Sequence, residues 1–211
     1  MKRLLILVMF SMFSCPAWAG VIQINSESDF LDILKVPYLF EDFSGYTYKS
    51  FVDYSLPLSE NGYQATLSAP RKLYSLDGSM STKWNNDPLI IDVAGSPLPV
   101  TAIGGYFWPS DMSGQSVSGS IKFTLSDGTD HVVQIDQANS STFLGFGTNG
   151  TAFARLEIIM IHDDPNEPTW PTLDNLYVGS DPPKSVPEPS ALLLLIMGLG
   201  GVGASFWRKG A

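Results

Sequence analysis

The side chains with the clearest potential for binding chemistry are tryptophans. The chain of 211 residues contains five, and three of them, Trp84, Trp108 and Trp170, lie in its central part. Exposed aromatic faces stack on the C–H groups of sugar rings, so these three are candidate ligand-binding residues. Trp108 and Trp170 each precede a proline, which predicts that they lie in loops. The alternative is that each indole packs in the core or anchors a loop.

Catalytic motifs are not found in the sequence. It has no Gly-x-Ser-x-Gly elbow and no His-Glu-x-x-His pair, and its two histidines, His131 and His162, have no recognisable partner residues. Gly145-Phe146-Gly147 superficially resembles a nucleotide loop but lacks a strand-loop-helix context, so we expect a bulge or turn. Glycoside hydrolysis needs two carboxyl groups about 5–10 Å apart, which spacing along the chain does not test. We expect no catalytic residue and no enzyme activity.

The charge balance argues against several classes of partner. Twelve Lys and Arg against 21 Asp and Glu give a net charge of −9. Electrostatic binding of nucleic acid, which needs clustered Lys and Arg, is therefore not expected. The acidic surface also disfavours polyanionic polysaccharide and favours divalent cations. The one cysteine, Cys15, excludes a disulfide within the chain, and with two histidines it cannot build a Cys/His zinc site.

The central region carries the alternating pattern of β-strands. Apolar or glycine residues occupy the odd positions of 117–125, and a second strand follows at 129–136. A three-residue loop with Gly128 in a left-handed conformation pairs Phe123 with His131 and keeps the apolar faces together. Further strands are expected at 38–43, 63–69, 72–76, 89–93, 100–108, 153–162 and 172–178.

These strands define the expected fold class. The run 156–161 is apolar on both faces after Glu157, which is typical of a central strand. A short helix is expected at 29–35, capped by Ser26 or Ser28. Short strands joined by Gly-, Pro-, Asn- and Asp-rich turns, without alternating helices, predict an all-β antiparallel sandwich of jelly-roll type over 20–180.

The N-terminus reads as a secretory signal peptide over 1–19. Lys2 and Arg3 precede an uncharged run, and Ala17 and Ala19 place the signal-peptidase cleavage before Gly20. The alternatives are a buried first helix and a lipoprotein signal acylated at Cys15. A bulky Phe13 stands near the position where lipoprotein signals carry a small residue, which disfavours the second alternative.

The C-terminus reads as a linker followed by a membrane helix. A proline-rich linker covers 181–190 and contains Pro187, Glu188 and Pro189. Within the predicted helix at 191–211, residues 191–207 carry no charge and reach about 25 Å, just enough to cross a bilayer. Arg208 and Lys209 follow and stay on the cytoplasmic side, so the central domain is placed outside the inner membrane.

Pro187-Glu188-Pro189, the glycine-bearing apolar helix and the Arg208-Lys209 pair together resemble the PEP-CTERM sorting tail of exported Gram-negative proteins. The resemblance implies recognition by exosortase, cleavage near the Pro-Glu-Pro element, and delivery to the cell surface or medium. The alternative is a plain C-terminal anchor. The same tail is sometimes labelled after ice-binding proteins, but no regular Thr-x-Thr array suggests an ice-binding face here.

The central region resembles the secreted jelly-roll domains often joined to such tails. The similar segments are Phe40-Glu41-Asp42-Phe43, 102–107, 143–146 and Leu173-Asp174-Asn175-Leu176. In jelly rolls of the carbohydrate-binding kind, a structural Ca²⁺ ties an early acidic residue to a late one, which implies Glu41 and Asp174 as metal ligands. The alternative is that both carboxylates face water at turns or edges.

Three functional hypotheses follow from the sequence. The first is a non-enzymatic surface or matrix protein that interacts with extracellular polysaccharide. The second is a carbohydrate-binding module that uses exposed tryptophans on one face. The third is a glycoside hydrolase, which requires a cleft with two close carboxylates.

Overall fold

The computed structural model describes residues 21–34, 36–46, 51–76, 78–136, 142–148, 150–162 and 168–180. The chain divides into two units between Asp181 and Pro182, and every described residue belongs to the first. The predicted signal peptide and its cleavage site, the proline-rich linker, the sorting motif and the C-terminal helix lie outside the described residues. Within the described part, no helix has the length and apolar character needed to span a bilayer.

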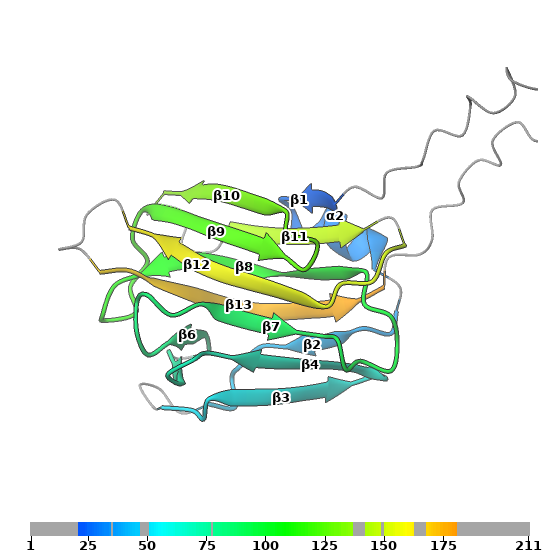
Figure 1. The fold of residues 1–211 in the computed structure, drawn as a ribbon, viewed down its shortest axis with the longest axis horizontal. Coiled ribbons are helices and arrows are strands. Elements are labelled where there is room, and N and C mark those ends of the chain that lie inside the picture. The colour runs from blue at the N-terminus through cyan, green and yellow to red at the C-terminus, as the bar shows by residue number, and fades with distance from the viewer. Residues whose placement is uncertain are drawn as a thin grey trace, which may run out of the picture. The chain divides into compact units, whose positions relative to one another are not determined.

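The described chain forms two antiparallel sheets (Figure 1). The seven-stranded sheet has the order β1-β11-β8-β13-β6-β5, and β2 also pairs with β13. The six-stranded sheet has the order β10-β9-β12-β7-β4-β3. The strands of the first sheet are β1 Val21–Ile24, β2 Leu39–Glu41, β5 Leu73–Ser75, β6 Met80–Thr82, β8 Ala102–Ser110, β11 Thr142–Thr148 and β13 Trp170–Gly179. Those of the second are β3 Ser55–Glu60, β4 Tyr63–Ser68, β7 Leu89–Asp92, β9 Gly119–Leu125, β10 Asp130–Ile135 and β12 Arg155–Ile161.

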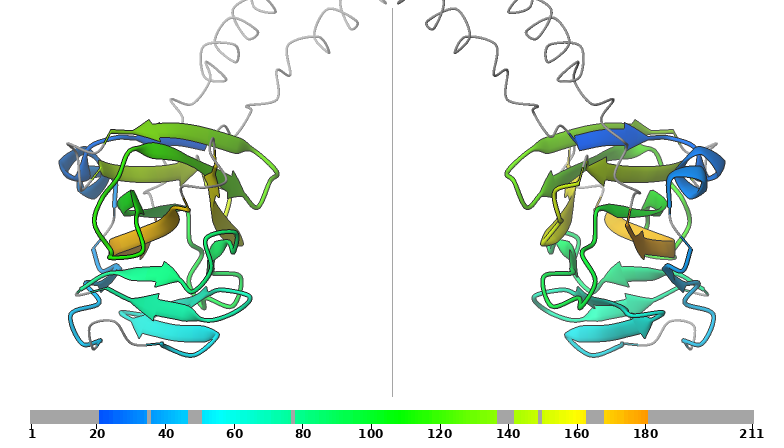
Figure 2. Two further views of the ribbon diagram at one scale, coloured as in Figure 1. Left: turned by 90° about the vertical axis from the view of Figure 1, so that its left-hand side faces the viewer. Right: turned by 90° about the vertical axis from the view of Figure 1, so that its right-hand side faces the viewer.

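The two sheets face each other and bury the core between them (Figure 2). Phe107 on β8 meets Phe123 on β9 edge-on, with ring centroids 5.1 Å apart, and Phe146 on β11 lies 5.2 Å from Phe123. All three rings are fully buried. The predicted all-β sandwich is therefore confirmed, and its main core joins alternate residues of both sheets.

The hairpin of β9 and β10 has the register predicted from the pattern. His131 pairs with Phe123 and Val133 with Ile121, and Gly128 has a φ of 85°. Glycine adopts this left-handed conformation without a Cβ clash, which closes the three-residue loop. Strand β12 lies between β9 and β7 and is central, as its two-sided apolar pattern predicted. Four strands were not predicted: β1, β3, β6 and β11.

A short helix, α2 (Glu27–Ile33), covers part of the outer face of the seven-stranded sheet. Ser26 is its N-cap, because its side chain accepts a hydrogen bond from the backbone N–H of Asp29. The helix buries Phe30 on two facing glycines, Gly104 of β8 and Gly145 of β11. A Cβ on Gly145 would lie 2.3 Å from a ring carbon of Phe30, so glycine is required for this close approach. The segment 145–147 is thus part of a strand, and the expectation of a bulge or turn was wrong.

Two tyrosine hydroxyls fasten this helix to the sheet. Tyr106 of β8 donates a hydrogen bond to Glu27 Oε2 at 2.5 Å, and Tyr177 of β13 donates one to Glu27 Oε1. The hydrogen bond to the Glu27 carboxylate, followed by burial, raises the pKa of Tyr106 to about 12. Burial, with the same carboxylate, raises the pKa of Tyr177 as well. Both hydroxyls therefore keep their protons as donors to Glu27 at neutral pH.

Alkaline pH is expected to weaken the fold through Tyr106. An unfolded tyrosine ionises near pH ~10, whereas the pKa of Tyr106 in the fold is about 12. Between these two pH values the unfolded chain binds fewer protons at this tyrosine than the folded chain does, so the free energy of unfolding falls as pH rises. Below pH ~10 the contribution of Tyr106 to stability is constant. The Tyr106→Phe variant should lose Tm less steeply over this alkaline range. Melting curves at increasing pH test this, and an equally steep decline in the variant would contradict it.

Candidate functional site

The outer face of the seven-stranded sheet holds the candidate site. On β8, Phe107 points into the core while Tyr106, Trp108 and Ser110 alternate onto the opposite face. On β13, Thr172 pairs with Trp108, and Trp170 pairs with Ser110. The register therefore places the two indoles on neighbouring strands and on one face of the sheet. Helix α2 packs on the other end of this face, beside Tyr106 and Tyr177, and contributes no residue to the pocket lining at the Trp170 end, which the helix leaves uncovered.

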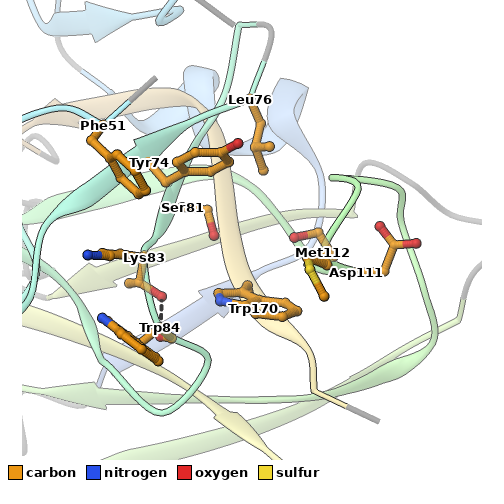
Figure 3. Close-up of a pocket in the computed structure, with 11 residues that line it drawn as sticks. Phe51, Tyr74, Leu76, Ser81, Lys83, Trp84, Asp111, Met112 and Trp170 are labelled. Atoms are coloured by element: carbon orange, nitrogen blue, oxygen red, sulfur yellow. Dashed lines mark hydrogen bonds between the residues drawn. The ribbon is translucent and has the colours of Figure 1, made fainter. Parts of the chain in front are cut away.

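A pocket of about 240 Å³ lies at the uncovered end (Figure 3). Five separated segments of the chain contribute to it, from Phe51, β5, β6 with its following turn, the end of β8 and the start of β13. Phe51, Tyr74, Lys83 and Trp84 form one side, and Asp111 and Met112 lie opposite, across Trp170. The full lining is Phe51, Tyr74, Leu76, Ser81, Thr82, Lys83, Trp84, Ser110, Asp111, Met112 and Trp170.

Buried hydroxyl groups lie beneath this pocket. Ser81 and Ser110 line it, and each exposes 1 % of its surface or less. Ser110 Oγ and Thr172 Oγ1 share a hydrogen bond of 2.7 Å, and Ser81 Oγ donates to the carbonyl of Pro171 at 2.9 Å. These hydrogen bonds satisfy the buried hydroxyls and join β6 and β8 to β13 beneath the aromatic rings.

The aromatic side chains around the pocket are accessible. Phe51 is 59 % exposed and Trp84 is 46 % exposed, while Tyr74 and Trp170 are half-buried. The rings of Phe51 and Tyr74 lie 5.3 Å apart, and the two residues form an isolated β-bridge. The four aromatic side chains line one pocket together, and it is such grouped exposed apolar surface, rather than single exposed residues, that marks interaction sites.

The loop from Asp111 to Gln115 forms a rigid wall. Asp111 Oδ1 accepts hydrogen bonds from the backbone N–H groups of Ser113 at 2.8 Å and Gln115 at 2.9 Å. The Asp111 backbone N–H also donates to the carbonyl of Gln115. Gly114, with a φ of 83°, packs on Leu76, where a Cβ would approach within 2.9 Å. The Asp111 carboxylate is therefore engaged by its own loop.

Trp84 is held in place by a charged pair behind it. Arg71 donates two hydrogen bonds to Asp87 Oδ1, from Nε at 2.9 Å and from Nη2 at 2.6 Å. Asp87 is buried, and its carboxylate raises the pKa of the Arg71 guanidinium. The guanidinium lies over the Trp84 ring, 4.9 Å from its centroid. This cation–π contact and the paired carboxylate set the orientation of the indole.

A second pocket of about 350 Å³ continues along the same face. It is lined by Leu76, Ser79, Trp108, Ser113, Gly114, Gln115 and Asp174. Leu76 belongs to both pockets, and the 111–115 loop contributes to each. The two pockets are therefore neighbours on one face, with Trp84 and Trp170 in the first and Trp108 in the second.

The structure corrects the expected location of two tryptophans. Trp108 lies within β8, in agreement with the strand predicted at 100–108, and Trp170 begins β13, so the expectation of loops was wrong for both. Their following prolines, Pro109 and Pro171, pair with each other across the two strands. The Pro109 carbonyl accepts from the backbone N–H of Val117, so a proline here does not end the strand.

Sequence reasoning missed Phe51, Tyr74, Lys83 and Met112. The alternation in the predicted strand 72–76 could have placed Tyr74 on an outer face, since Leu73 and Ser75 on either side are buried. We find no local pattern that would have identified Phe51, Lys83 or Met112.

Of the two residues suggested as calcium ligands, Glu41 ends β2 beside β13 and Asp174 lies within β13, and one oxygen of each accepts a local backbone hydrogen bond. Glu41 pairs with Leu176, and its Oε1 accepts from the backbone N–H of Phe43 at 2.9 Å. Asp174 Oδ1 accepts from the N–H of Asn175 at 2.6 Å. Burial raises the pKa of Asp174, and the negative charge of Asp42 adds to this effect. Over the described residues, no three His, Cys, Asp or Glu side chains are grouped to hold a metal ion.

Residues 185–209 match the PEP-CTERM protein-sorting motif, which confirms the resemblance stated for the C-terminal tail. This motif implies an exported protein that exosortase processes. The chain has no match among the curated proteins.

Two solved structures of CBM29-2 mutants, from studies of ligand recognition by family 29 carbohydrate-binding modules, are similar to the chain. For the lysine-to-alanine mutant the identity is 10 %, with 72 % of this chain and 96 % of that chain covered and a TM-score of 0.33. For the aspartate-to-alanine mutant the identity is 8 %, with coverages of 81 % and 99 % and a TM-score of 0.33.

Proposed function

We propose that residues 20–180 form a non-enzymatic carbohydrate-binding domain of jelly-roll type, carried by an exported cell-surface or matrix protein. The observation that carries the proposal is the pocket at the uncovered end of the seven-stranded sheet, where four aromatic rings surround a floor of buried hydroxyls. Its ligand in this proposal is extracellular polysaccharide.

The arrangement suits a sugar ring chemically. Stacking on Trp84, Trp170, Tyr74 or Phe51 buries the apolar C–H face of the ring, and little side-chain entropy is lost because these side chains are stiff. The neighbouring pocket with Trp108 lies on the same face, so a chain of sugar units can extend from one pocket into the other. We therefore expect oligosaccharides to bind more tightly than monosaccharides.

In this proposal the C-terminal tail directs the export and sorting of the domain. In the proposed route, the export machinery and signal peptidase act at Ala17, Ala19 and Gly20, and the C-terminal helix holds the domain at the inner membrane. Exosortase then cleaves near Pro187-Glu188-Pro189. The PEP-CTERM match at 185–209 supports the last step. Intact mass of the secreted protein tests the route, and secreted material that retains residues 192–207 would count against cleavage.

A hydrolase is the alternative, and product formation separates the two. Each pocket has one carboxylate in its described lining, Asp111 in the first and Asp174 in the second. Hydrolysis by a carboxylate pair needs a second group about 5–10 Å away. Under our proposal, polysaccharide incubated with the protein gains no new reducing ends. Release of reducing ends that is lost in an Asp174→Asn variant would favour the hydrolase.

A structural Ca²⁺ bound by Glu41 and Asp174 remains a prediction from the sequence. Ca²⁺ takes six to eight oxygen ligands, and the carboxylates of Glu41 and Asp174 alone do not supply them. If the ion binds the folded state, chelation with EDTA should lower the Tm, and excess Ca²⁺ should restore it. A Tm that is the same with and without EDTA would reject the Glu41–Asp174 site.

The cation–π contact between Arg71 and Trp84 predicts that Arg71, which does not line the pocket, affects ligand affinity. Arg71→Ala removes the guanidinium over Trp84 and leaves the buried Asp87 without its partner. Because the indole then loses its fixed orientation, affinity for an oligosaccharide should fall about two- to fivefold. Titration calorimetry measures this. Arg155→Ala is the matched control, since Arg155 pairs with Glu157 on the six-stranded sheet; equal affinities of the two variants would show that Arg71 does not position Trp84.

The binding experiment uses full-length protein in a detergent without a sugar headgroup, because a glycosidic detergent would compete for the pocket. A panel of soluble gluco-, manno- and galacturono-oligosaccharides is titrated against it by calorimetry. Saturable binding of any member supports the proposal. No binding across the panel, with a folded protein by circular dichroism, would remove its basis.

A further inference from the structure

The rim of the aromatic pocket carries a lysine in an unusual position. The ammonium of Lys83 lies between two aromatic rings, 5.0 Å from the centroid of Phe51 and 5.7 Å from that of Trp84 (Figure 3). The Lys83 backbone N–H donates to the carbonyl of Lys72 at 3.0 Å, which sets two lysines side by side at the ends of β6 and β5. Both rings that flank the ammonium line the proposed sugar site.

The carboxylates near Lys83 are engaged elsewhere. Among the described residues, the ion pairs join Arg71 to Asp87, Lys122 to Asp130 and Arg155 to Glu157, so Lys83 and Lys72 have no carboxylate within 4.0 Å. Asp111, across the pocket, is held by its own loop. Asp53, beside the Tyr54 ring over which Lys72 lies, accepts from the Tyr54 backbone N–H. Lys83 is therefore the cationic side chain of the described pocket lining, on the side of Phe51 and Trp84, while the Asp111 carboxylate lies on the opposite side.

This local charge differs in sign from that of the whole protein. The net charge of −9 disfavours polyanions at long range, but the Debye length is about 8 Å at physiological ionic strength. Distant carboxylates are screened at that distance, whereas an anion bound on the aromatic rings would lie within reach of the Lys83 ammonium. Lys83 therefore sets the preferred ligand charge beside the Phe51 and Trp84 rings.

From this geometry we infer that the pocket selects a glycan whose sugar units carry a carboxylate, with Lys83 pairing to that carboxylate while the ring stacks on Trp84 or Trp170. The inference rests on the proposed carbohydrate-binding function and adds the class of sugar to it. It also limits the expectation that polyanionic polysaccharide is disfavoured, because that expectation used only the net charge.

The experiment compares two forms of one polymer. Soluble galacturonan oligomers and their methyl esters have the same sugar chain and differ in charge, so the ratio of their affinities isolates the contribution of the carboxylate. A hydrogen bond to a charged group corresponds to a preference of about tenfold for the free acid. Calorimetry on the full-length protein gives both affinities under the same buffer and salt.

Variants of Lys83 assign the preference to one residue. Lys83→Gln should reduce the affinity ratio to about one, and Lys83→Arg should retain it, because the positive charge is kept. Lys122→Gln is the control, since Lys122 lies on the six-stranded sheet and already pairs with Asp130. An effect common to both polymers cancels in the ratio, and Lys83→Arg shows whether a loss reflects charge rather than folding.

The outcomes separate the two proposals. A tenfold preference that Lys83→Gln removes supports the inference. Equal binding of the acid and the ester overturns the inference and leaves carbohydrate binding intact, whereas binding of neither polymer nor any neutral oligosaccharide overturns both. Equally tight binding of dextran sulfate would show a general anion site rather than a carboxylated-sugar site, and would also overturn the inference.

Discussion

Replacing Trp170 by alanine is expected to lower the affinity for a bound oligosaccharide about thirtyfold or more, which corresponds to ~2 kcal/mol of binding free energy. Trp170 lies at the centre of the pocket, between the aromatic rim and the loop that carries Met112. Its indole is one of the two largest ring systems in the pocket lining, so its loss removes stacking area and admits water. Calorimetry with the best ligand of the panel measures the change.

The matched control for this variant is Phe40→Ala. Phe40 is also an exposed aromatic residue on the seven-stranded sheet, but it contacts Tyr177 outside the pocket. The account predicts near wild-type affinity for Phe40→Ala. If both variants lose the same affinity, the effect reflects the sheet as a whole, and the pocket is not the binding site.

Replacing Phe30 by alanine is expected to lower the free energy of unfolding by about 3–5 kcal/mol. The Phe30 ring is fully buried, packs on Gly104 and Gly145, and lies 5.4 Å from the ring of Phe143. The two glycines cannot fill the space that the ring leaves, so a cavity remains beneath α2. This loss is a large part of the stability of a typical domain.

Chemical denaturation monitored by circular dichroism measures the Phe30 effect. Ile22→Ala is the control, because Ile22 is 43 % exposed on β1 and its loss should cost about 0.5 kcal/mol. A Phe30→Ala variant that is as stable as Ile22→Ala would contradict the role of this ring as the anchor of the helix on the sheet.

The parts of the fold that could be predicted are those in which a local pattern determines the structure. The β9–β10 register follows because a shift by one residue would place Lys122 among apolar neighbours. Ser26 caps α2 because its short side chain reaches the N–H of Asp29. These choices depend on residues close together in the chain, so the sequence contains them directly.

Other elements could not be predicted because their residues serve distant partners. Gly145 and Gly147 resemble turn residues, yet they belong to β11, and Gly145 makes room for Phe30 of a helix more than a hundred residues earlier. The three residues of β6 are all buried and show no alternation. In β13 a proline follows Trp170, which predicts a loop, but Pro171 pairs with Pro109 within the sheet.

The candidate site was predicted in part. Tryptophan content identified Trp84 and Trp170, which the fold brings to one pocket, and Trp108, which it places in the neighbouring pocket. Phe51, Tyr74 and Lys83 join them only because β-pairing brings distant segments side by side. Such a juxtaposition depends on sheet register over long separations, which spacing along the sequence does not encode.

The most direct test of the carbohydrate-binding face follows the indole N–H signals of the tryptophans by NMR. In the unprocessed full-length chain each of the five tryptophans gives one such signal, and Trp→Phe variants assign them. On addition of the tightest-binding oligosaccharide, the account predicts saturable shifts at Trp84 and Trp170, while the signals of Trp18 and Trp207 stay in place. If the ligand binds and the Trp84 and Trp170 signals do not move, the proposed face is not where sugar is held.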